Sequence, residues 1–202
     1  MYTDRTGKLV VVVASVLMVV GCKGKDADTA SRDSAAGVAA APDTAKPAAA
    51  TAPTLTDPNI VYILDQANAS DSARGHLATT KGTSADVKAY GRLMSGEHHA
   101  LRQQGQQLAS KLSVTPQTPS GDQSEAQAKQ IMDSLQALPK GKAWDKAYID
   151  YEVGYHQAVL ETATKALGAA QNQELKDLIQ KAAPVIQHHL ERAQQIQKSL
   201  GT

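Results

Sequence analysis

The chain contains one cysteine, Cys22, and no phenylalanine among its 202 residues. A single cysteine excludes an internal disulfide framework and a zinc site built from several cysteines. Since aromatic residues make up only 3% of the chain, its core must consist mainly of aliphatic side chains. The sequence also lacks an alternating strand pattern, a glycine-rich phosphate loop and the turn that presents a serine nucleophile.

Basic and acidic residues are almost equal in number. The formal net charge is +1, and the basic and acidic residues are interspersed along the chain. Nucleic-acid-binding domains usually carry a basic stripe or patch on one face, and the sequence offers none. We therefore expect no nucleic-acid partner.

Residues 1–21 are typical of a cleavable lipoprotein signal peptide. Arg5 and Lys8 precede an apolar run, residues 9–20, that is shorter than the roughly 20 residues of a membrane-spanning helix. The run ends in Val-Val-Gly-Cys, residues 19–22, which resembles the bacterial lipobox. Cys22 is therefore the predicted lipid-attachment site, and the alternative is an ordinary thiol after a plain secretory signal.

Lipid on Cys22 would hold the mature protein to a membrane of the bacterial cell envelope, facing the periplasm. Several acyl chains anchor a protein stably, whereas one chain alone binds only marginally. Lys23 follows the cysteine at the position where an aspartate would favour retention in the inner membrane. The outer membrane is therefore the favoured location.

Residues 22–56 are predicted to be a disordered linker. From Lys23 to Thr56 the chain is rich in Ala, Thr, Asp, Ser and Pro, and its only large aliphatic residues are Val38 and Leu55. Such a segment cannot bury enough apolar surface to offset the entropy lost on ordering. We interpret it as a spacer between the lipid and the folded domain.

Residues 57–202 are predicted to form one helical domain, because apolar residues recur there at helical spacing. Asp57 is the expected N-cap of the first helix and Pro58 its first helical residue. Gly82 interrupts the pattern, and Thr83 or Ser84 can cap the second helix.

The connection from Ser113 to Lys142 is long for a helical bundle and contains a predicted short helix near 123–137. Two further helices follow it. Four helices with a long crossover between the second and third match the ferritin-like class of four-helix bundle, which is the predicted fold.

Each of the four long helices carries an ionisable residue on or beside its apolar stripe, near the middle of the helix. These residues are Asp71, His98 with Glu97 beside it, His156 one turn after Glu152, and His189. Counted from the connecting turns, Asp71 and His98 differ in height by roughly 6 Å, and His156 and His189 by roughly 7 Å. Side chains at these offsets can meet in one layer.

Two interpretations of this layer remain open. Imidazole nitrogens and carboxylate oxygens are ligands of zinc, iron, copper and manganese, so the six residues are candidate metal ligands. Alternatively, they form a hydrogen-bonded polar layer that fixes helix register without metal. His76, His99 and His188 are expected to point away from the apolar stripes. No catalytic set and no site for an organic cofactor is indicated.

The domain resembles a bacterial ferritin-like family, domain of unknown function four-one-four-two, whose members are labelled membrane proteins or lipoproteins. The matching stretches are Val87–Tyr90 leading to Met94 and Glu97–His98, Trp144–Ile149 leading to Glu152 and Tyr155–Gln157, and Asn172–Leu175 leading to Pro184 and His189–Glu191. The resemblance implies the fold and no activity. Di-iron proteins of this class use Glu-x-x-His pairs, which this chain lacks.

The sequence therefore favours an envelope lipoprotein with a non-enzymatic structural, protective or protein-binding role. The alternative is a metal-binding or redox protein with a site in the middle of the bundle. An envelope protein is a conceivable partner, and the sequence does not specify an oligomeric state.

Overall fold

The computed structural model describes residues 55–201, and these residues form helices and no strands. The predicted all-α class is confirmed for this part of the chain. The described residues belong to one compact unit. The predicted signal peptide, the lipidation site Cys22 and nearly all of the predicted linker lie outside the described residues.

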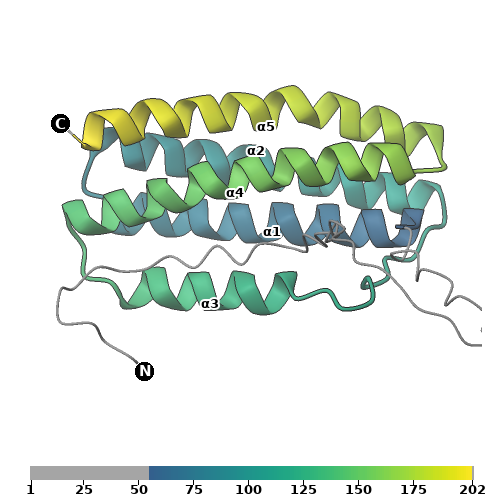
Figure 1. The fold of residues 1–202 in the computed structure, drawn as a ribbon, viewed down its shortest axis with the longest axis horizontal. Helices are drawn as coiled ribbons and strands as arrows, with labels where there is room; N and C mark the ends of the chain where they lie inside the picture. The colour runs from purple at the N-terminus through teal and green to yellow at the C-terminus, as the bar shows by residue number, and fades with distance from the viewer. Residues whose placement is uncertain (1–54, 202) are drawn as a thin grey trace, which may run out of the picture. The chain divides into compact units, whose positions relative to one another are not determined.

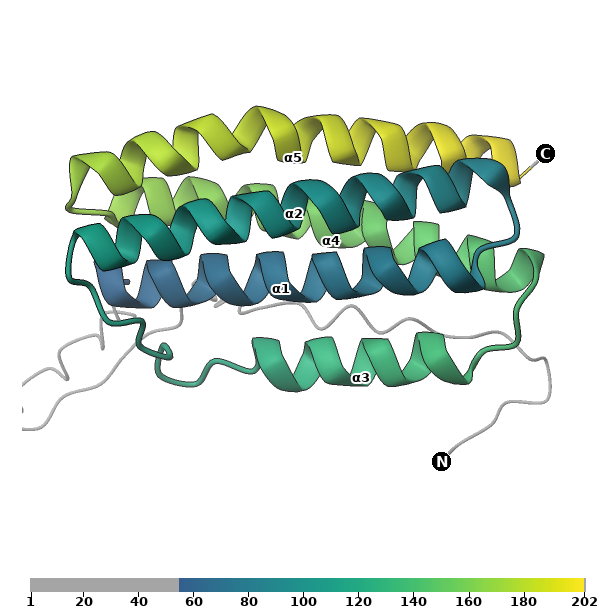
Figure 2. The same ribbon diagram turned by 180° about the vertical axis from the view of Figure 1, so that it is seen from behind.

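The described part of the chain has five helices, which form a bundle. They are α1 (Asp57–Lys81), α2 (Ala85–Lys111), α3 (Ser124–Ala137), α4 (Lys142–Ala169) and α5 (Gln173–Leu200). Helix α1 packs along α2, and α4 packs along α5; α2 also contacts α5, and α1 contacts α4. Figures 1 and 2 show these four long helices side by side, with the shorter α3 along the outer side of α1.

Helix α1 begins one residue away from the predicted cap. Thr56 is the N-cap, and Thr56 and Asn59 form a capping box. Asp57 is not the cap, so this prediction was wrong. Its carboxylate instead accepts hydrogen bonds from the backbone amides of Gln171 (2.8 Å) and Asn172 (3.0 Å), which ties the α4–α5 turn to the start of α1.

The turn between α1 and α2 is fastened to α4. Ser84 is the N-cap of α2, as one of the two predicted alternatives. Asp145, which is buried in α4, accepts hydrogen bonds from the backbone amides of Thr83 and Ser84, each at 2.8 Å. These bonds satisfy amides that a helix start would otherwise leave unpaired.

Helix α3 is the predicted short helix, and it is attached through its C-terminal carbonyls. Lys81 donates from Nζ to the carbonyls of Leu135 (3.2 Å) and Leu138 (2.6 Å). Trp144 donates from Nε1 to the carbonyl of Leu135 at 2.8 Å. A cation at the C-terminus also interacts favourably with the helix dipole.

The apolar core consists of two clusters, and the ionisable layer lies between them along every long helix. The first cluster is Ala78, Val87, Tyr90, Met94, Leu135, Trp144, Tyr148, Ile149, Ala193 and Ile196. The second is Ile60, Val61, Ala109, Ala166, Ala170, Leu175 and Ile179. The polar residues are therefore enclosed by apolar packing on both sides.

Helices α1 and α2 touch through their backbones at Gly75 and Gly91. A Cβ atom on Gly91 would lie 2.7 Å from the carbonyl oxygen of Gly75, and one on Gly75 would lie 2.6 Å from the amide nitrogen of Ser95. Ser72 also donates to the carbonyl of Ser95 at 3.1 Å. This close approach brings the side chains of the two helices together in the layer.

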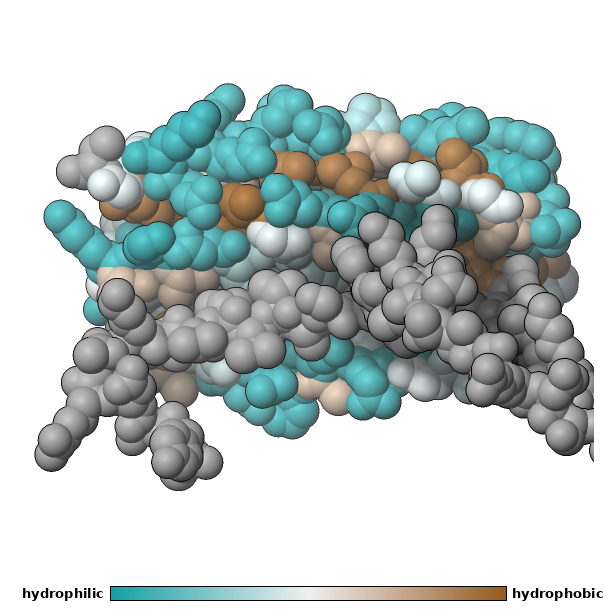
Figure 3. Space-filling view, viewed as in Figure 1, coloured by the Kyte–Doolittle hydropathy of each residue, from teal (hydrophilic) through white to brown (hydrophobic). Residues whose placement is uncertain are grey.

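Polar residues cover much of the outer surface. On the face seen in Figure 3, hydrophilic side chains lie over most of α5, and a row of hydrophobic residues lies beside them. Among the described helices, none is both long and apolar enough to span a membrane.

Replacing Gly91 by alanine should destabilise the bundle, because the new methyl group meets the α1 backbone. We expect the free energy of unfolding to fall by about 1–3 kcal/mol, the usual cost of overpacking. Gly96→Ala is the matched control on the same helix, because a Cβ there meets nothing within 4 Å. It should be neutral or raise stability by up to about 1 kcal/mol. Urea denaturation measures both, and equal stabilities of the two variants would contradict the close contact.

Candidate metal centre

The middle of the bundle holds a buried polar layer with members from all four long helices. Its fully buried members, each at most 2% exposed, are Asp71 and Arg74 of α1, His98 of α2, Glu152 and His156 of α4, and His189 of α5. Buried ionisable groups are costly unless they are paired, hydrogen-bonded or bound to a metal. The contacts within the layer therefore decide what it can do.

Three histidines from three helices meet at the centre of this layer. The ring centroids of His98 and His189 are 4.9 Å apart, those of His156 and His189 are 5.5 Å apart, and those of His98 and His156 are 5.7 Å apart. One ring nitrogen of each histidine lies within 4.8 Å of those of the other two. We call His98, His156 and His189 the histidine triad.

Each ring of the histidine triad is oriented by a hydrogen bond to an acceptor. His98 donates from Nδ1 to the side-chain oxygen of Asn68 at 2.8 Å, and Asn68 in turn donates to the carbonyl of Leu64. His156 donates from Nδ1 to the carbonyl of Glu152 at 2.9 Å.

The third ring is held by a carboxylate. His189 donates from Nε2 to Glu97 at 2.7 Å. Carbonyl and carboxylate oxygens can only accept, so these partners fix which nitrogen carries the proton in each neutral ring.

The second nitrogen of each ring is left without a partner. Nε2 of His98, Nε2 of His156 and Nδ1 of His189 are buried and make no hydrogen bond. In the neutral rings these three atoms carry lone pairs. Several buried acceptors without a donor are unusual in one place, because most buried polar groups have a partner.

A buried cation and two carboxylates adjoin the histidine triad. Arg74 donates from Nε to Glu152 at 2.9 Å, and it also makes a short contact from Nη2 to Asp71. Asp71 Oδ2 lies 3.6 Å from Nε2 of His98, and Glu152 Oε2 lies 3.5 Å from Nδ1 of His156. Neither of these two oxygens has a hydrogen-bond partner.

Burial keeps two rings of the triad neutral at physiological pH. It lowers the pKa of His98 to about 3, with smaller contributions from His189 and His156. Burial also lowers the pKa of His189, although Glu97 opposes the shift. A metal binds the neutral form of imidazole, so the lowered pKa values leave these rings ready to act as ligands.

On the other side of the layer, Asp71 and Glu152 lie beside the positive charge of Arg74. Burial raises the pKa of Glu152, while Arg74 acts against that shift. Burial alone would lower the pKa of Arg74, but Glu152 and then Asp71 outweigh it, and the pKa lies above its usual value. Arg74 is therefore a permanent positive charge within the layer.

Comparison with known protein families identifies the domain. The family described as "Domain of unknown function (DUF4142)" has a model that matches residues 42–196, more than half of the chain. The chain belongs to this family. The resemblance seen in the sequence is confirmed, and the match begins within the predicted linker. No curated protein and no solved structure matches the chain.

Five of the six candidate ligands predicted from sequence are buried in the layer of this DUF4142 domain. Glu97 is the exception: its side chain is 44% exposed, and it binds His189 on the side away from the free nitrogen. Glu97 therefore lies where it can orient the ring of His189 without binding a metal itself.

Two members of the layer are absent from the predicted set. Arg74 follows Asp71 by three residues and Asn68 precedes it by three, so helical spacing puts both on the same face as Asp71. That spacing was the available signal. An arginine is ordinarily exposed, however, and an asparagine on an apolar stripe specifies no partner.

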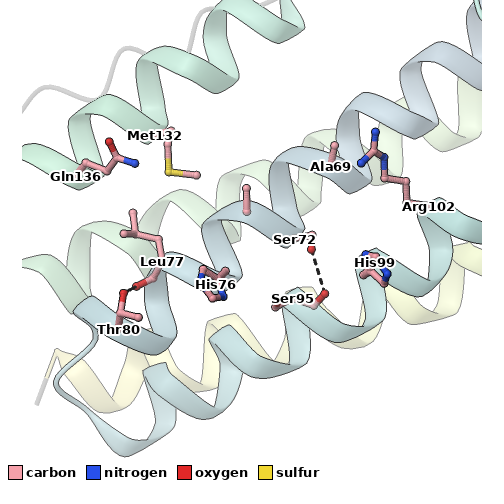
Figure 4. A pocket seen from close by; sticks show the side chains of 11 residues that line it. Ala69, Ser72, His76, Leu77, Thr80, Ser95, His99, Arg102, Met132 and Gln136 are labelled. Atoms are coloured by element: carbon pink, nitrogen blue, oxygen red, sulfur yellow. Dashed lines mark hydrogen bonds between the residues drawn. The ribbon is translucent and has the colours of Figure 1, made fainter.

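The remaining histidines of the DUF4142 domain lie on its surface. His76, His99 and His188 are exposed, as expected. Figure 4 shows His76 and His99 along an outer groove of α1 and α2, with Met132 and Gln136 of α3 across from it. These rings provide natural controls, because His99 and His188 adjoin members of the histidine triad in sequence.

An apolar cavity of about 310 Å³ lies beside the layer, between α1, α2 and α5. Asn68, which orients His98, also lines this cavity. Near its rim Arg102 binds Asp65 at 2.9 Å, so the charges there are paired. Its aliphatic lining adds no further histidine or cysteine to the candidate centre.

The lowered pKa of His98 predicts that acid destabilises the metal-free domain. In the unfolded chain a histidine has a pKa of about 6.5. Between this value and about 3 the unfolded state binds more protons, so stability falls as the pH falls through that window. The free energy of unfolding should fall by up to about 1.4 kcal/mol for each pH unit in this window, for one histidine.

Urea denaturation from pH 7 to pH 4 with a chelator present tests this pH dependence. His98→Gln should make it shallower, because the variant lacks one of the buried histidines that titrate, while His189 remains. His99→Gln, which changes an exposed neighbour, should leave it as in the unaltered protein. Identical pH profiles for the two variants would show that burial of His98 does not control acid stability.

Proposed function

We propose that this protein is a lipid-anchored protein of the bacterial cell envelope whose helical domain binds a transition-metal ion. The ligands are Nε2 of His98, Nε2 of His156 and Nδ1 of His189, and Asp71 Oδ2 lies 3.6 Å from the first of these nitrogens. Its role is binding or redox chemistry rather than turnover of a substrate.

The observation that carries this proposal is the set of three buried imidazole nitrogens without partners. Three buried lone pairs that accept no hydrogen bond carry the desolvation cost of unpaired polar groups. A cation bound between them would remove this cost. One ring nitrogen of each histidine lies within 4.8 Å of those of the other two, and binding would draw the rings inward to the closer spacing of ligands around one ion.

The outer hydrogen bonds support the same proposal. Metal-binding histidines almost always donate their other ring N–H to a carboxylate, a carbonyl or water. Glu97, the carbonyl of Glu152 and Asn68 accept these bonds here. A ligand set dominated by imidazole suits zinc, copper or iron better than manganese, which prefers oxygen.

The burial of the ligands favours binding over catalysis. His156 and His189 have no exposed surface, and His98 is only 2% exposed, so a substrate has no open approach to the ion. Catalytic metal sites instead keep one coordination position open to water or substrate. An electron can reach a buried ion without such an opening, which leaves a redox role available.

We also propose that the domain is a ferritin-like four-helix bundle. The pairs α1–α2 and α4–α5 and the long connection between α2 and α4 support this assignment. The signal peptide, the lipid on Cys22 and the outer-membrane location are proposed from the sequence alone.

Metal binding is tested on protein prepared without an affinity tag. After separate equilibration with zinc, copper, iron or manganese and removal of excess ion, elemental analysis should find bound metal. Binding should also raise the free energy of unfolding, by about 2.7 kcal/mol when the free metal concentration is a hundred times the dissociation constant. His98→Ala and His156→Ala should abolish both effects.

His99→Ala and His188→Ala are the matched controls for these variants, because both side chains are exposed. They should bind metal as the unaltered protein does. If no metal binds and none raises stability, the layer is a structural polar layer that holds water or hydrogen bonds alone. Equal losses in all four variants would indicate surface binding instead.

Lipid attachment is tested at Cys22. Mass spectrometry of protein extracted from membranes should find an N-terminal cysteine that carries acyl chains, with residues 1–21 removed. Cys22→Ser should remove the lipid and release the protein from the membrane fraction. An unmodified Cys22 thiol in the mature protein would contradict the lipoprotein assignment.

A further inference from the structure

Two buried carboxylates from different helices share one arginine in the polar layer. Asp71 of α1 and Glu152 of α4 each give one oxygen to the guanidinium of Arg74. All three side chains are at most 1% exposed. Each carboxylate keeps its other oxygen, and Arg74 keeps Nη1, without a partner.

The same carboxylates belong to a second group of potential metal ligands. One oxygen of Asp71, one oxygen of Glu152 and one ring nitrogen of His156 lie within 4.8 Å of one another. This group shares His156 with the histidine triad. His156 has only one lone-pair nitrogen, which the histidine triad uses, so Asp71 and Glu152 are the ligands that a second ion would have here; carboxylate oxygens suit zinc, iron or manganese.

The guanidinium of Arg74 already supplies a positive charge at the second group. Its Nε donates to Glu152 at 2.9 Å, and the rings of Tyr151 and Tyr155 lie 4.8 Å and 4.2 Å from its central carbon. Tyr155 is itself held by Ser70, whose hydroxyl lies 3.2 Å from the tyrosine oxygen. The arginine is therefore fixed in place by two ion pairs and two cation–π contacts.

We infer that Arg74 takes the place of a second metal ion, so that the centre binds one ion at the histidine triad and no more. A guanidinium and a divalent cation compete for the same carboxylate charge, and the repulsion between them adds to that competition. This inference rests on the proposed function for the first ion, whereas the carboxylates that Arg74 holds, Asp71 and Glu152, are separate from the three imidazole nitrogens proposed for that ion.

Removing the guanidinium should open the second position. Arg74→Met keeps a long side chain but leaves Asp71 and Glu152 without their cation. In tag-free protein equilibrated with excess zinc and then freed of unbound ion, elemental analysis should rise from one zinc per chain to two. The double variant Arg74→Met with Glu152→Gln should return to one, because it lacks a ligand of the second group.

Two single variants control for charge and for arginine loss in general. Arg74→Lys retains a cation beside the carboxylates and should keep one zinc per chain. Arg102→Met removes an arginine of α2 that is paired with Asp65 at the surface, and it should also keep one. A rise to two in Arg74→Lys would show that a cation at this place does not exclude a second zinc, and a rise in Arg102→Met would show that the second zinc is unrelated to the buried carboxylates.

Folding of Arg74→Met is followed by circular dichroism. If the variant is unfolded without metal, zinc should restore its helical signal and a chelator should reverse the change, because the second ion replaces the missing charge. Failure of zinc to restore the fold would overturn the inference.

The zinc counts also separate this inference from the proposed function. One zinc in both the unaltered protein and folded Arg74→Met would overturn the role of Arg74 and leave the histidine triad site intact. No zinc in the unaltered protein but one in Arg74→Met would overturn the proposed function, and it would support only the exclusion of zinc from the carboxylates by Arg74. No zinc in either protein would overturn both.

Discussion

The hydrogen bonds that orient His98, His156 and His189 determine what the middle of this bundle can do. Each bond uses one ring nitrogen as a donor and leaves the other buried without a hydrogen-bond partner. A hydrogen-bond donor at each of these second nitrogens would instead have made a satisfied polar layer from the same rings. The candidate centre thus depends less on the presence of three histidines than on the partners that fix their protons.

The rest of the fold serves to hold this layer in register. Apolar clusters on both sides exclude water from it, and the backbone contact at Gly75 and Gly91 brings α1 against α2. Asp57 and Asp145 fasten the two helix turns to neighbouring helices through backbone amides. These constraints fix the relative heights of the helices, and the heights decide whether residues far apart in sequence meet.

Much of this arrangement could be predicted from sequence, because helical periodicity is a local signal. It located the helices and placed Asp71, His98, His156 and His189 inward. It could not specify partners, since these depend on packing between helices: Glu97 adjoins His98 in sequence yet binds His189, on another helix. Arg74 escaped prediction for the same reason, because its burial depends on Glu152, 78 residues later.

The protonation of the three rings is the most direct test of this account. In metal-free protein at neutral pH, nitrogen-15 NMR of labelled histidines should find His98 and His156 protonated at Nδ1 and His189 protonated at Nε2. The rings of His98 and His189 should be neutral, with the remaining nitrogen free of a proton. Protons on Nε2 of His98 and His156, or a doubly protonated ring in the triad, would contradict a centre built from converging lone pairs.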